Sequence, residues 1–508
     1  MSFGPPSSAY TQSALSSDDR RKNRRRRTAL VVAGAAVALA VLVGGGVWLF
    51  RDGDSGSVPA DRQAAAQDRL DVRETVEERP ASVAGQMAFR FSADDLSPGE
   101  RYEMPGMWAT DKILAKGINR TLVGFALGTD AAVGDEQWNL RLAGPVCGVT
   151  KRVSVENRTA VLFRSGEDDD ALCDRLAFVD LDTGKKLWQA EMPVPGSEDS
   201  ASQDLPAVTL THATVAVTWG DGADAYDMDS GERLWRVKAA DSCAYVGAGG
   251  GRALLTRIRC YNGDAVSGSN SETTYQVRKL DPRTGKTRWT YEVARNTRGV
   301  ALVSAEPAVI GISAGDAEIT ELISLDGQGG HRATIGLKSG RYLGECTEDT
   351  DRYTVEDCPT IAVGDDQVFL RSKETDATGD KQEGAAHVSN WIVGFDLATG
   401  NTVKKFESGP DQVLYPLRMS GDRLLALRES NDHISPNGLV SLDPATGEET
   451  PYLYFDLPVE GYELTAVEDN DIVVEDGRLF FGRRAATGPT DGSQKAWQWL
   501  VLGVGSTG

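Results

Sequence analysis

Hydrophobic and polar positions divide the chain into three unequal parts. Residues 29 to 50 carry no charge, residues 51 to 85 are polar and poor in aromatics, and from about Gln86 onward short apolar runs alternate with Gly, Asp and Asn. Runs such as VAVTW at 215–219, ALLTRI at 253–258 and RLFFG at 478–482 are typical of short strands bounded by turns. The pattern predicts a helical segment, a polar connection and an all-β domain over residues 86–505.

The uncharged segment has the length of a membrane span. Its 22 residues from Ala29 to Phe50 would extend about 33 Å as a helix, against roughly 30 Å of bilayer hydrocarbon. Seven positive charges in the eight positions Arg20–Arg27 precede it, which favours a cytoplasmic N-terminus. We therefore expect a basic cytoplasmic tail at 1–27 and a single transmembrane helix at 28–50. A cleaved signal peptide ending near Gly44–Gly46 remains the alternative.

Residues 51–85 are expected to form a polar stalk, with helix over part of Arg62–Glu78, that holds the β domain outside the cell membrane. The tail carries seven basic and two acidic residues, so that residues 51–508 have a formal charge of −26 against −21 for the whole chain. An acidic extracytoplasmic region disfavours nucleic acid as a partner, because phosphate binding requires a basic surface.

An internal repeat governs the β region. Seven segments place an Asp four residues before a Gly, and the Asp-to-Asp spacings are 50, 47, 54, 45, 70 and 47 residues. The pairs are Asp130/Gly134, Asp180/Gly184, Asp227/Gly231, Asp281/Gly285, Asp326/Gly330, Asp396/Gly400 and Asp443/Gly447. A period near 50 in a chain of short strands predicts the blades of a β-propeller.

Each repeat has the chemistry of a tight turn followed by a docking residue. The Asp carboxylate and the Thr or Ser hydroxyl can accept backbone N–H groups, and the Gly can adopt a positive φ. Four segments place a Trp four residues after the Gly, at Trp138, Trp188, Trp235 and Trp289. We expect these rings to pack between adjacent blades, where a large flat side chain buries about 150 to 250 Å².

The repeat resembles that of the propellers with PQQ-type repeats, which include quinoprotein alcohol dehydrogenases and BamB-type envelope assembly proteins. The resemblance rests on FVDLDTGKKLW and LDPRTGKTRW, is strong in blades two to four, and fades at Ala333, Lys404 and Pro451. It implies eight blades. Seven motifs are followed by DIVVEDGRLFFGRR and KAWQWLVLGV, which supply three strands, so we predict that residues 86–92 complete the eighth blade and close the ring.

Six cysteines follow the predicted anchor: Cys147, Cys173, Cys243, Cys260, Cys346 and Cys358. An even number in an oxidising compartment indicates disulfides. Fifteen pairings are possible, and we favour neighbour with neighbour because each pair then encloses a short stretch. Cys243 and Cys260 flank two apolar runs separated by Gly249–Gly251, which would place them across a hairpin. The close spacing of a zinc site is absent.

No set of catalytic residues can be matched. A quinoprotein dehydrogenase would need a quinone pocket, a calcium ion and an Asp base, and the adjacent Cys pair often found against the quinone in that family is missing. Gly311–Gly315 fits the G-x-S-x-G hydrolase pattern but lies in a segment predicted as strand, turn and strand, without the helix that a nucleophile elbow requires. The four His residues are scattered, and no cofactor or metal is expected.

These observations predict a non-enzymatic, membrane-tethered propeller that binds a protein or cell-envelope component through loops at one face. A quinone-dependent oxidoreductase that uses the propeller funnel is the alternative. A carbohydrate-binding surface at Trp219 and Trp391, which lie outside the repeated Trp position, is a third and weaker hypothesis.

Overall fold

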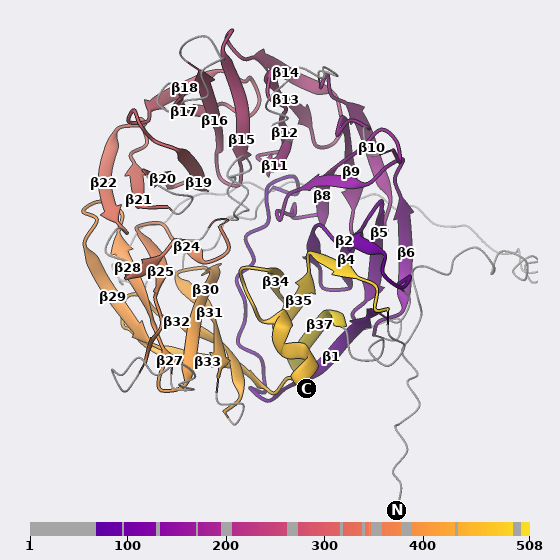
Figure 1. Ribbon diagram of the computed structural model, residues 1–508, viewed down its shortest axis with the longest axis vertical. Helices are drawn as coiled ribbons and strands as arrows, with labels where there is room; N and C mark the ends of the chain where they lie inside the picture. The colour runs from indigo at the N-terminus through magenta and orange to yellow at the C-terminus, as the bar shows by residue number, and fades with distance from the viewer. Residues whose placement is uncertain are drawn as a thin grey trace, which may run out of the picture.

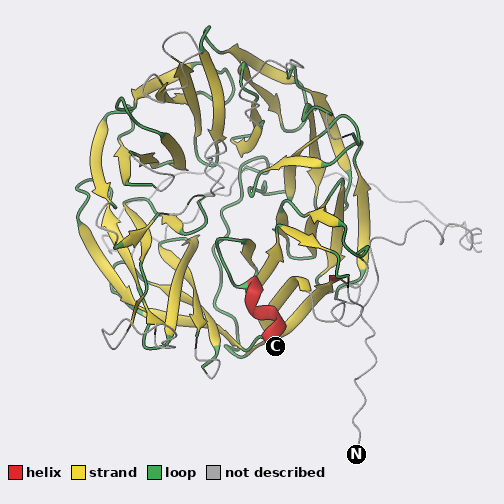
Figure 2. Ribbon diagram, in the orientation of Figure 1, coloured by secondary structure: helices red, strands yellow, loops and turns green. Residues whose placement is uncertain are grey.

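Radially arranged sheets surround a centre in the computed structural model of the chain (Figure 1). The structure describes residues 68–93, 96–128, 133–168, 171–194, 206–261, 273–314, 319–337, 341–344, 346, 358–376, 388–431, 435–490 and 499–507. Strands dominate these residues (Figure 2), and the fold is an all-β eight-bladed propeller, as the repeat predicted.

Blades one to seven follow one another along the chain, each with its first strand innermost and its last outermost. Blade one comprises β3 (Met107–Ala109), β4 (Ile113–Ile118), β5 (Thr121–Ala126) and β6 (Glu136–Arg141), blade two β7 (Val146–Val149), β8 (Arg158–Phe163), β9 (Arg175–Asp180) and β10 (Lys186–Glu191), and blade three β11 (Ala207–Thr211), β12 (Thr214–Thr218), β13 (Gly222–Asp227) and β14 (Arg233–Lys238). Blade four comprises β15 (Cys243–Gly249), β16 (Leu254–Tyr261), β17 (Thr273–Leu280) and β18 (Thr287–Glu292), and blade five β19 (Gly299–Ala305), β20 (Ala308–Ser313), β21 (Glu321–Leu325) and β22 (His331–Gly336).

The later blades carry additional elements. Blade six comprises β23 (Tyr342–Leu343), β24 (Ile361–Val363), β25 (Gln367–Ser372), β28 (Trp391–Asp396) and β29 (Thr402–Glu407), and blade seven β30 (Gln412–Ser420), β31 (Arg423–Ser430), β32 (Asn437–Leu442) and β33 (Glu449–Phe455). The short strands β26 (Thr375–Asp376) and β27 (Val388–Ser389) extend blade seven beyond its inner strand, and the 3-10 helix η5 (Val459–Leu464) leads into blade eight.

The eighth blade joins the two ends of the domain. Its inner strands are β34 (Asn470–Glu475), β35 (Arg478–Arg483) and β37 (Trp499–Ser506), and its outermost strand is β1 (Gly85–Ser92). β1 pairs antiparallel with β37, from Gly85 opposite Ser506 to Ser92 opposite Trp499. The prediction that residues 86–92 close the ring is confirmed.

The repeated Asp residues cap turns. In the turn of blade four, the Asp281 carboxylate accepts the Thr284 amide at 2.9 Å and the Thr284 hydroxyl at 2.8 Å, and Asp396 accepts the equivalent groups of Thr399 at 2.7 and 2.9 Å. Asp180, Asp227 and Asp443 bond to their turns in the same manner. The Gly at the fourth position has a positive φ in each of these turns, at Gly184, Gly231, Gly285, Gly400 and Gly447.

The Trp of one blade lies on the Gly of the next blade's turn. A Cβ added to Gly231 would lie 2.6 Å from the Trp188 ring, and a Cβ added to Gly285 would lie 2.7 Å from Trp235. Nε1 of Trp138, Trp188 and Trp235 donates to the carbonyl that follows the Asp of that next turn, at Leu181, Met228 and Pro282 respectively. The turn therefore needs Gly both for its backbone conformation and because the neighbouring ring leaves no space for a side chain.

The fifth turn departs from the predicted register. The glycine with positive φ is Gly329, not Gly330, and Trp289 packs on Gly329. The turn is one residue tighter, because the amide of Gly329 donates to Asp326 three residues earlier, where the other turns bond over four. In this blade Ala333, four residues after Gly329, occupies the position that Trp has in the earlier blades. Ala333 faces Gly400 of blade six.

Residues 68–84 form an extended strap across one end of the ring. In Figure 1 this segment crosses the centre, from the side of blades two and three to the edge of blade eight, where it continues into β1. Val72 bridges to Ser154, and Ala84 bridges to Tyr454. The expected stalk over 51–85 is therefore wrong from Asp68 onward. Helix over 68–78 is also wrong, because the Arg73 amide donates to the Val153 carbonyl and the Leu70 and Asp71 carbonyls accept amides of the ring.

The predicted basic tail at 1–27, the predicted span at 28–50 and residues 51–67 of the predicted stalk lie outside the described residues. In the part of the chain that the structure describes, no helix has the length and apolar character needed to cross a membrane.

Candidate functional site

The ring has two unlike ends. The hairpins between the first and second strands of the blades and the Asp–Gly turns lie at the end crossed by the strap, which we call the strap end. The other end, which we call the disulfide end, carries the connections between second and third strands and the connections from blade to blade. All three disulfides lie there.

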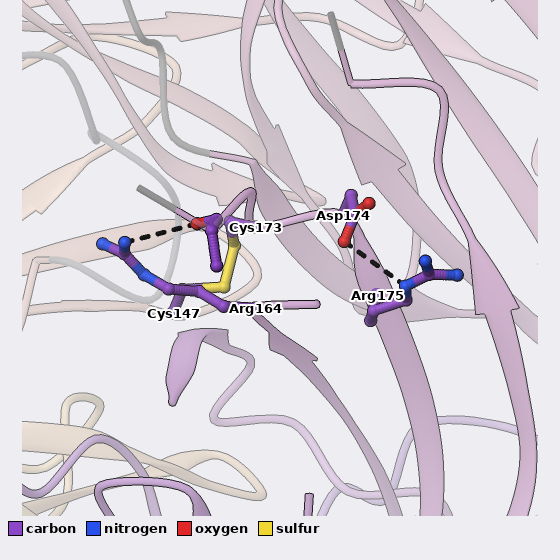
Figure 3. The surroundings of a disulfide bond; sticks show 6 residues. Cys147, Arg164, Cys173, Asp174 and Arg175 are labelled. Carbon is purple, nitrogen blue, oxygen red and sulfur yellow. Dashed lines mark hydrogen bonds and ion pairs between the residues drawn. A yellow bond between two sulfur atoms is a disulfide. The ribbon is translucent and has the colours of Figure 1, made fainter. Parts of the chain in front are cut away.

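The pairing of the cysteines is neighbour with neighbour, as we favoured from the sequence. Cys147 near the start of β7 bonds to Cys173 immediately before β9 (Figure 3), which ties two adjacent connections of blade two together. Cys243 and Cys260 are directly opposite each other on β15 and β16, so they lie across the hairpin that the sequence predicted.

The third disulfide closes an insertion in blade six. β23 and β24 both pair with β25, so residues 344–360 interrupt the innermost strand of this blade. Cys346 and Cys358 join the two arms of the interruption. The disulfides therefore brace blades two, four and six at one end of the ring.

Accessory structure is added at the same end. β2 (Arg101–Glu103), which belongs to the connection from blade eight to blade one, pairs with β36 (Ala485–Thr487) after β35. Ser389 of β27 pairs with Gln412 of β30. Connections that carry additional structure on a rigid scaffold are where binding residues are commonly placed.

A pocket of about 500 Å³ opens beside η5 and the end of β35. It is lined by Glu463, Ala466, Asp469, Asn470, Arg483, Arg484 and Ala485. Arg483 donates to the Glu463 carboxylate at 2.6 Å, and Arg484 donates to the carbonyls of Glu468 and Asn470 at 2.8 and 3.1 Å. Five of the seven lining residues are charged or carry an amide, and the two guanidinium groups are held in place by the chain around them.

An ionic triad lies next to this pocket, between blades eight and one. Nζ of Lys116 is 3.0 Å from Oδ2 of Asp471, and Nε of Arg484 is 3.1 Å from Oδ1. Burial alone would raise the pKa of Asp471, but the positive charges of Lys116, Lys151 and Arg484 outweigh it and lower that pKa to about 2. Asp471 therefore remains ionised. Its partner Lys116 is fully buried.

A second cluster joins blades six, seven and eight. Arg371 on β25 donates to Glu468 and lies over the Tyr415 ring, 4.8 Å from its centre. Burial raises the pKa of the Glu429 carboxyl, and the hydrogen bond from Thr465 opposes this shift. Burial also raises the pKa of Tyr415, so its phenol stays neutral.

The carboxylates of these two clusters do not form the calcium site that a quinone cofactor would require. Calcium takes six to eight oxygen ligands from carboxylates, carbonyls and waters. Here Asp471 is held by Lys116 and Arg484, and Glu468 is held by Arg371. Among the described residues, no group of three or more His, Cys, Asp or Glu side chains could hold a metal ion.

The remaining sequence candidates have structural surroundings. Gly311 and Ser313 belong to β20, and Gly315 lies outside the described residues, so the described part of the pattern is strand. Trp219 is buried and has the Arg236 guanidinium 5.6 Å from its ring centre, so the expectation that it is exposed for sugar binding is wrong. Trp391 is partly buried, with Nζ of Lys405 3.6 Å from its ring centre.

Sequence reasoning missed the ionic clusters. Lys116 and Asp471 are far apart in the chain and meet because the closed ring places blade one beside blade eight. Arg371 meets Glu468 through the packing of blades six, seven and eight. A charged residue inside an otherwise apolar strand, as in ILAKGI and QVFLRS, is the signal that could have drawn attention to two of them.

A family model described as outer membrane protein assembly factor BamB matches residues 126–316. A comparison with curated protein sequences gives no match.

Solved structures similar to this chain include BamB from Moraxella catarrhalis, with 13% identity, a TM-score of 0.38, and coverage of 80% of this chain and 99% of that one. A europium-containing methanol dehydrogenase has 11% identity, a TM-score of 0.45, and coverage of 85% and 95%. A quinohemoprotein alcohol dehydrogenase from Comamonas testosteroni has 12% identity, a TM-score of 0.42, and coverage of 87% and 82%.

Proposed function

We propose that this chain is a membrane-tethered, extracytoplasmic propeller that binds a protein or cell-envelope component without catalysis, through the disulfide end of its ring. The observation that carries the proposal is the separation of two features. The strap, which comes from the N-terminal side, occupies one end of the ring, and the disulfides and accessory strands occupy the other.

The position of the strap and the disulfides at opposite ends of the ring implies an orientation relative to the membrane. If residues 28–50 span the membrane, the chain reaches the ring through the strap, so the strap end faces the membrane and the disulfide end faces away. Disulfides persist in oxidising compartments, which supports an extracytoplasmic position. The match of residues 126–316 to a family of envelope assembly proteins supports an envelope partner.

The ionic clusters support binding over chemistry. Arg371, Arg484 and Lys116 have carboxylate partners within the ring, so they hold blades and connections in fixed positions. A rigid surface with a pocket and braced connections is suited to recognition, because little conformational entropy is lost on binding.

Site-specific photo-crosslinking of the full chain in its native membrane tests the proposal. The crosslinking residue is placed at Tyr261 and Glu463 on the disulfide end, whose side chains are exposed, and at Glu232 and Asn401 as matched controls in exposed turns of the strap end. We expect one recurrent crosslinked partner from the first pair of positions and none from the controls.

Two outcomes would overturn the proposal. Crosslinks from Glu232 and Asn401 alone would place the binding surface at the wrong end. Dye reduction by the full chain supplied with pyrroloquinoline quinone, calcium and an alcohol or sugar would show an oxidoreductase instead.

A further inference from the structure

A hairpin turn in blade three breaks the local rules of its type. β11 and β12 are joined by two residues, His212 and Ala213, with φ of +30° and +56°. Two-residue hairpin turns with positive φ at both positions favour Asn-Gly or related pairs, because a Cβ is strained in this conformation. The corresponding tip in blade eight, Asp476–Gly477, follows the rule. Residues that break such a rule are frequently functional.

The strained turn holds the strap. The amide of Ala213 donates to the Leu70 carbonyl at 3.1 Å, and Nδ1 of His212 is 3.2 Å from Oδ1 of Asp71. On the other side of the imidazole, Nε2 of His212 is 2.6 Å from the carbonyl oxygen of Arg252, at the hairpin of the adjacent blade four. One imidazole therefore lies between the strap and two adjacent blades.

Both partners of the imidazole are acceptors. A carbonyl oxygen accepts only, and an ionised carboxylate accepts only. A neutral imidazole has one N–H group and can donate to one of the two, whereas an imidazolium donates to both. The observed arrangement thus has its full set of hydrogen bonds when His212 is protonated.

The other charges around this contact belong to the strap and to neighbouring hairpins. The Arg252 guanidinium is 3.4 Å from Glu74 of the strap and 2.8 Å from Asp365 of blade six. Arg283 of blade four donates to the Ala213 carbonyl and to Asp227. Asp71 is the acidic group that the imidazole contacts directly, so the charge on His212 acts mainly on the strap.

We propose that His212 is a pH-sensitive clamp that fastens the strap across its end of the ring when protonated and loosens it when neutral. Histidine changes charge between about pH 5 and pH 8, so the clamp responds over that range. The sign follows from the geometry: the strap is held more firmly as the pH falls and less firmly as it rises.

Residue-resolved hydrogen exchange on the full chain tests the clamp. The reporters are the amides of Ala213 and Val155, which donate to the strap carbonyls of Leu70 and Asp71. After correction for intrinsic exchange, we expect both to exchange about three to five times more slowly at about pH 5.5 than at about pH 7.5. His212→Gln, which cannot titrate, should remove this pH dependence.

Two further variants keep the test decisive. Asp71→Asn leaves the strained turn untouched and should also remove the pH dependence, so a folding defect of His212→Gln would not decide the outcome. His331→Gln is the matched control, because His331 contacts Thr334 of its own strand and should leave the reporters as in the wild type. Equal protection at the two pH values in the wild type, or unchanged pH dependence in both His212→Gln and Asp71→Asn, would overturn the proposal.

Discussion

Trp235 and Trp289 occupy the same position in adjacent blades, yet their surroundings differ in one respect. Each ring lies on the positive-φ glycine of the next turn, Gly285 for Trp235 and Gly329 for Trp289. Nε1 of Trp235 donates to Pro282 at 2.7 Å, whereas within the described residues Nε1 of Trp289 has no hydrogen-bond acceptor. The shorter turn of blade five accounts for the difference, because it shifts the carbonyls relative to the ring.

The difference separates two roles of the motif. The contact between ring and glycine is kept in both turns, and the indole hydrogen bond is lost in one. Packing of the ring on the glycine is therefore the common requirement. The hydrogen bond is an addition that depends on the length of the turn.

The largest effect should come from the glycines of the fifth turn. Gly329→Ala should lower the free energy of unfolding by about 2 kcal/mol or more, because Ala would be strained at this φ and its Cβ would lie 2.6 Å from Trp289. Gly330→Ala should cost about 1 kcal/mol or less, because the φ of Gly330 is not positive and its Cβ would approach Oδ2 of Asp326, at the end of a side chain that can shift. Denaturant unfolding of the full chain in detergent measures both.

The same pair of variants checks the register of the turn. If Gly330→Ala proved the more damaging substitution, the glycine of the motif would be at position 330, as the spacing of the sequence repeat suggested, and the tighter turn would be wrong.

A smaller effect should separate the two rings. Trp235→Phe and Trp289→Phe remove a similar volume, but only Trp235→Phe leaves a carbonyl without its donor. We expect Trp235→Phe to lower the free energy of unfolding by about 1 kcal/mol more than Trp289→Phe. Parallel denaturation curves of the two variants give this difference, and equal losses would show that the hydrogen bond of Trp235 contributes nothing.

The sequence predicted the repetitive part of the molecule because its signals are local. In five of the seven motifs the Asp, the Thr or Ser and the Gly lie within five residues, so hydrogen bonding and φ preferences could be read directly. The count of strands after the last motif predicted closure by residues 86–92, since a blade with three strands leaves an edge to be paired. Asp130 of the first motif lies outside the described residues; among the six motifs that the structure describes in full, the error of register is at Gly329, where two glycines are adjacent.

The parts that were missed depend on contacts between distant segments. Glu77 reads as a solvated residue of a polar segment, but it is buried against Arg418 and the Gly477 amide, more than 340 residues away. The polar composition of this segment predicted a stalk. That prediction failed because ion pairs can hold a polar segment to a surface in place of apolar contacts. The Asp471 cluster likewise depends on ring closure, and the Arg371 cluster depends on packing between neighbouring blades; no local pattern encodes either.

The smallest expected effect is a loss of stability at low pH, and it concerns the carboxylate of Asp281, which has a Thr partner in its turn. The Thr284 hydroxyl, together with the Arg288 guanidinium and the Thr284 amide, holds the pKa of Asp281 below its usual range. A carboxyl whose pKa is lower in the folded state contributes stability above its unfolded pKa and loses it as the pH falls through the folded value, so this contribution should disappear below about pH 4. Asp281→Asn should therefore be less stable than the wild type by about 0.5 kcal/mol near neutral pH and should match it in strong acid. Unfolding midpoints measured from about pH 7 to about pH 2.5 give the test, and a constant difference across that range would mean that the charge of Asp281 has no part in the turn.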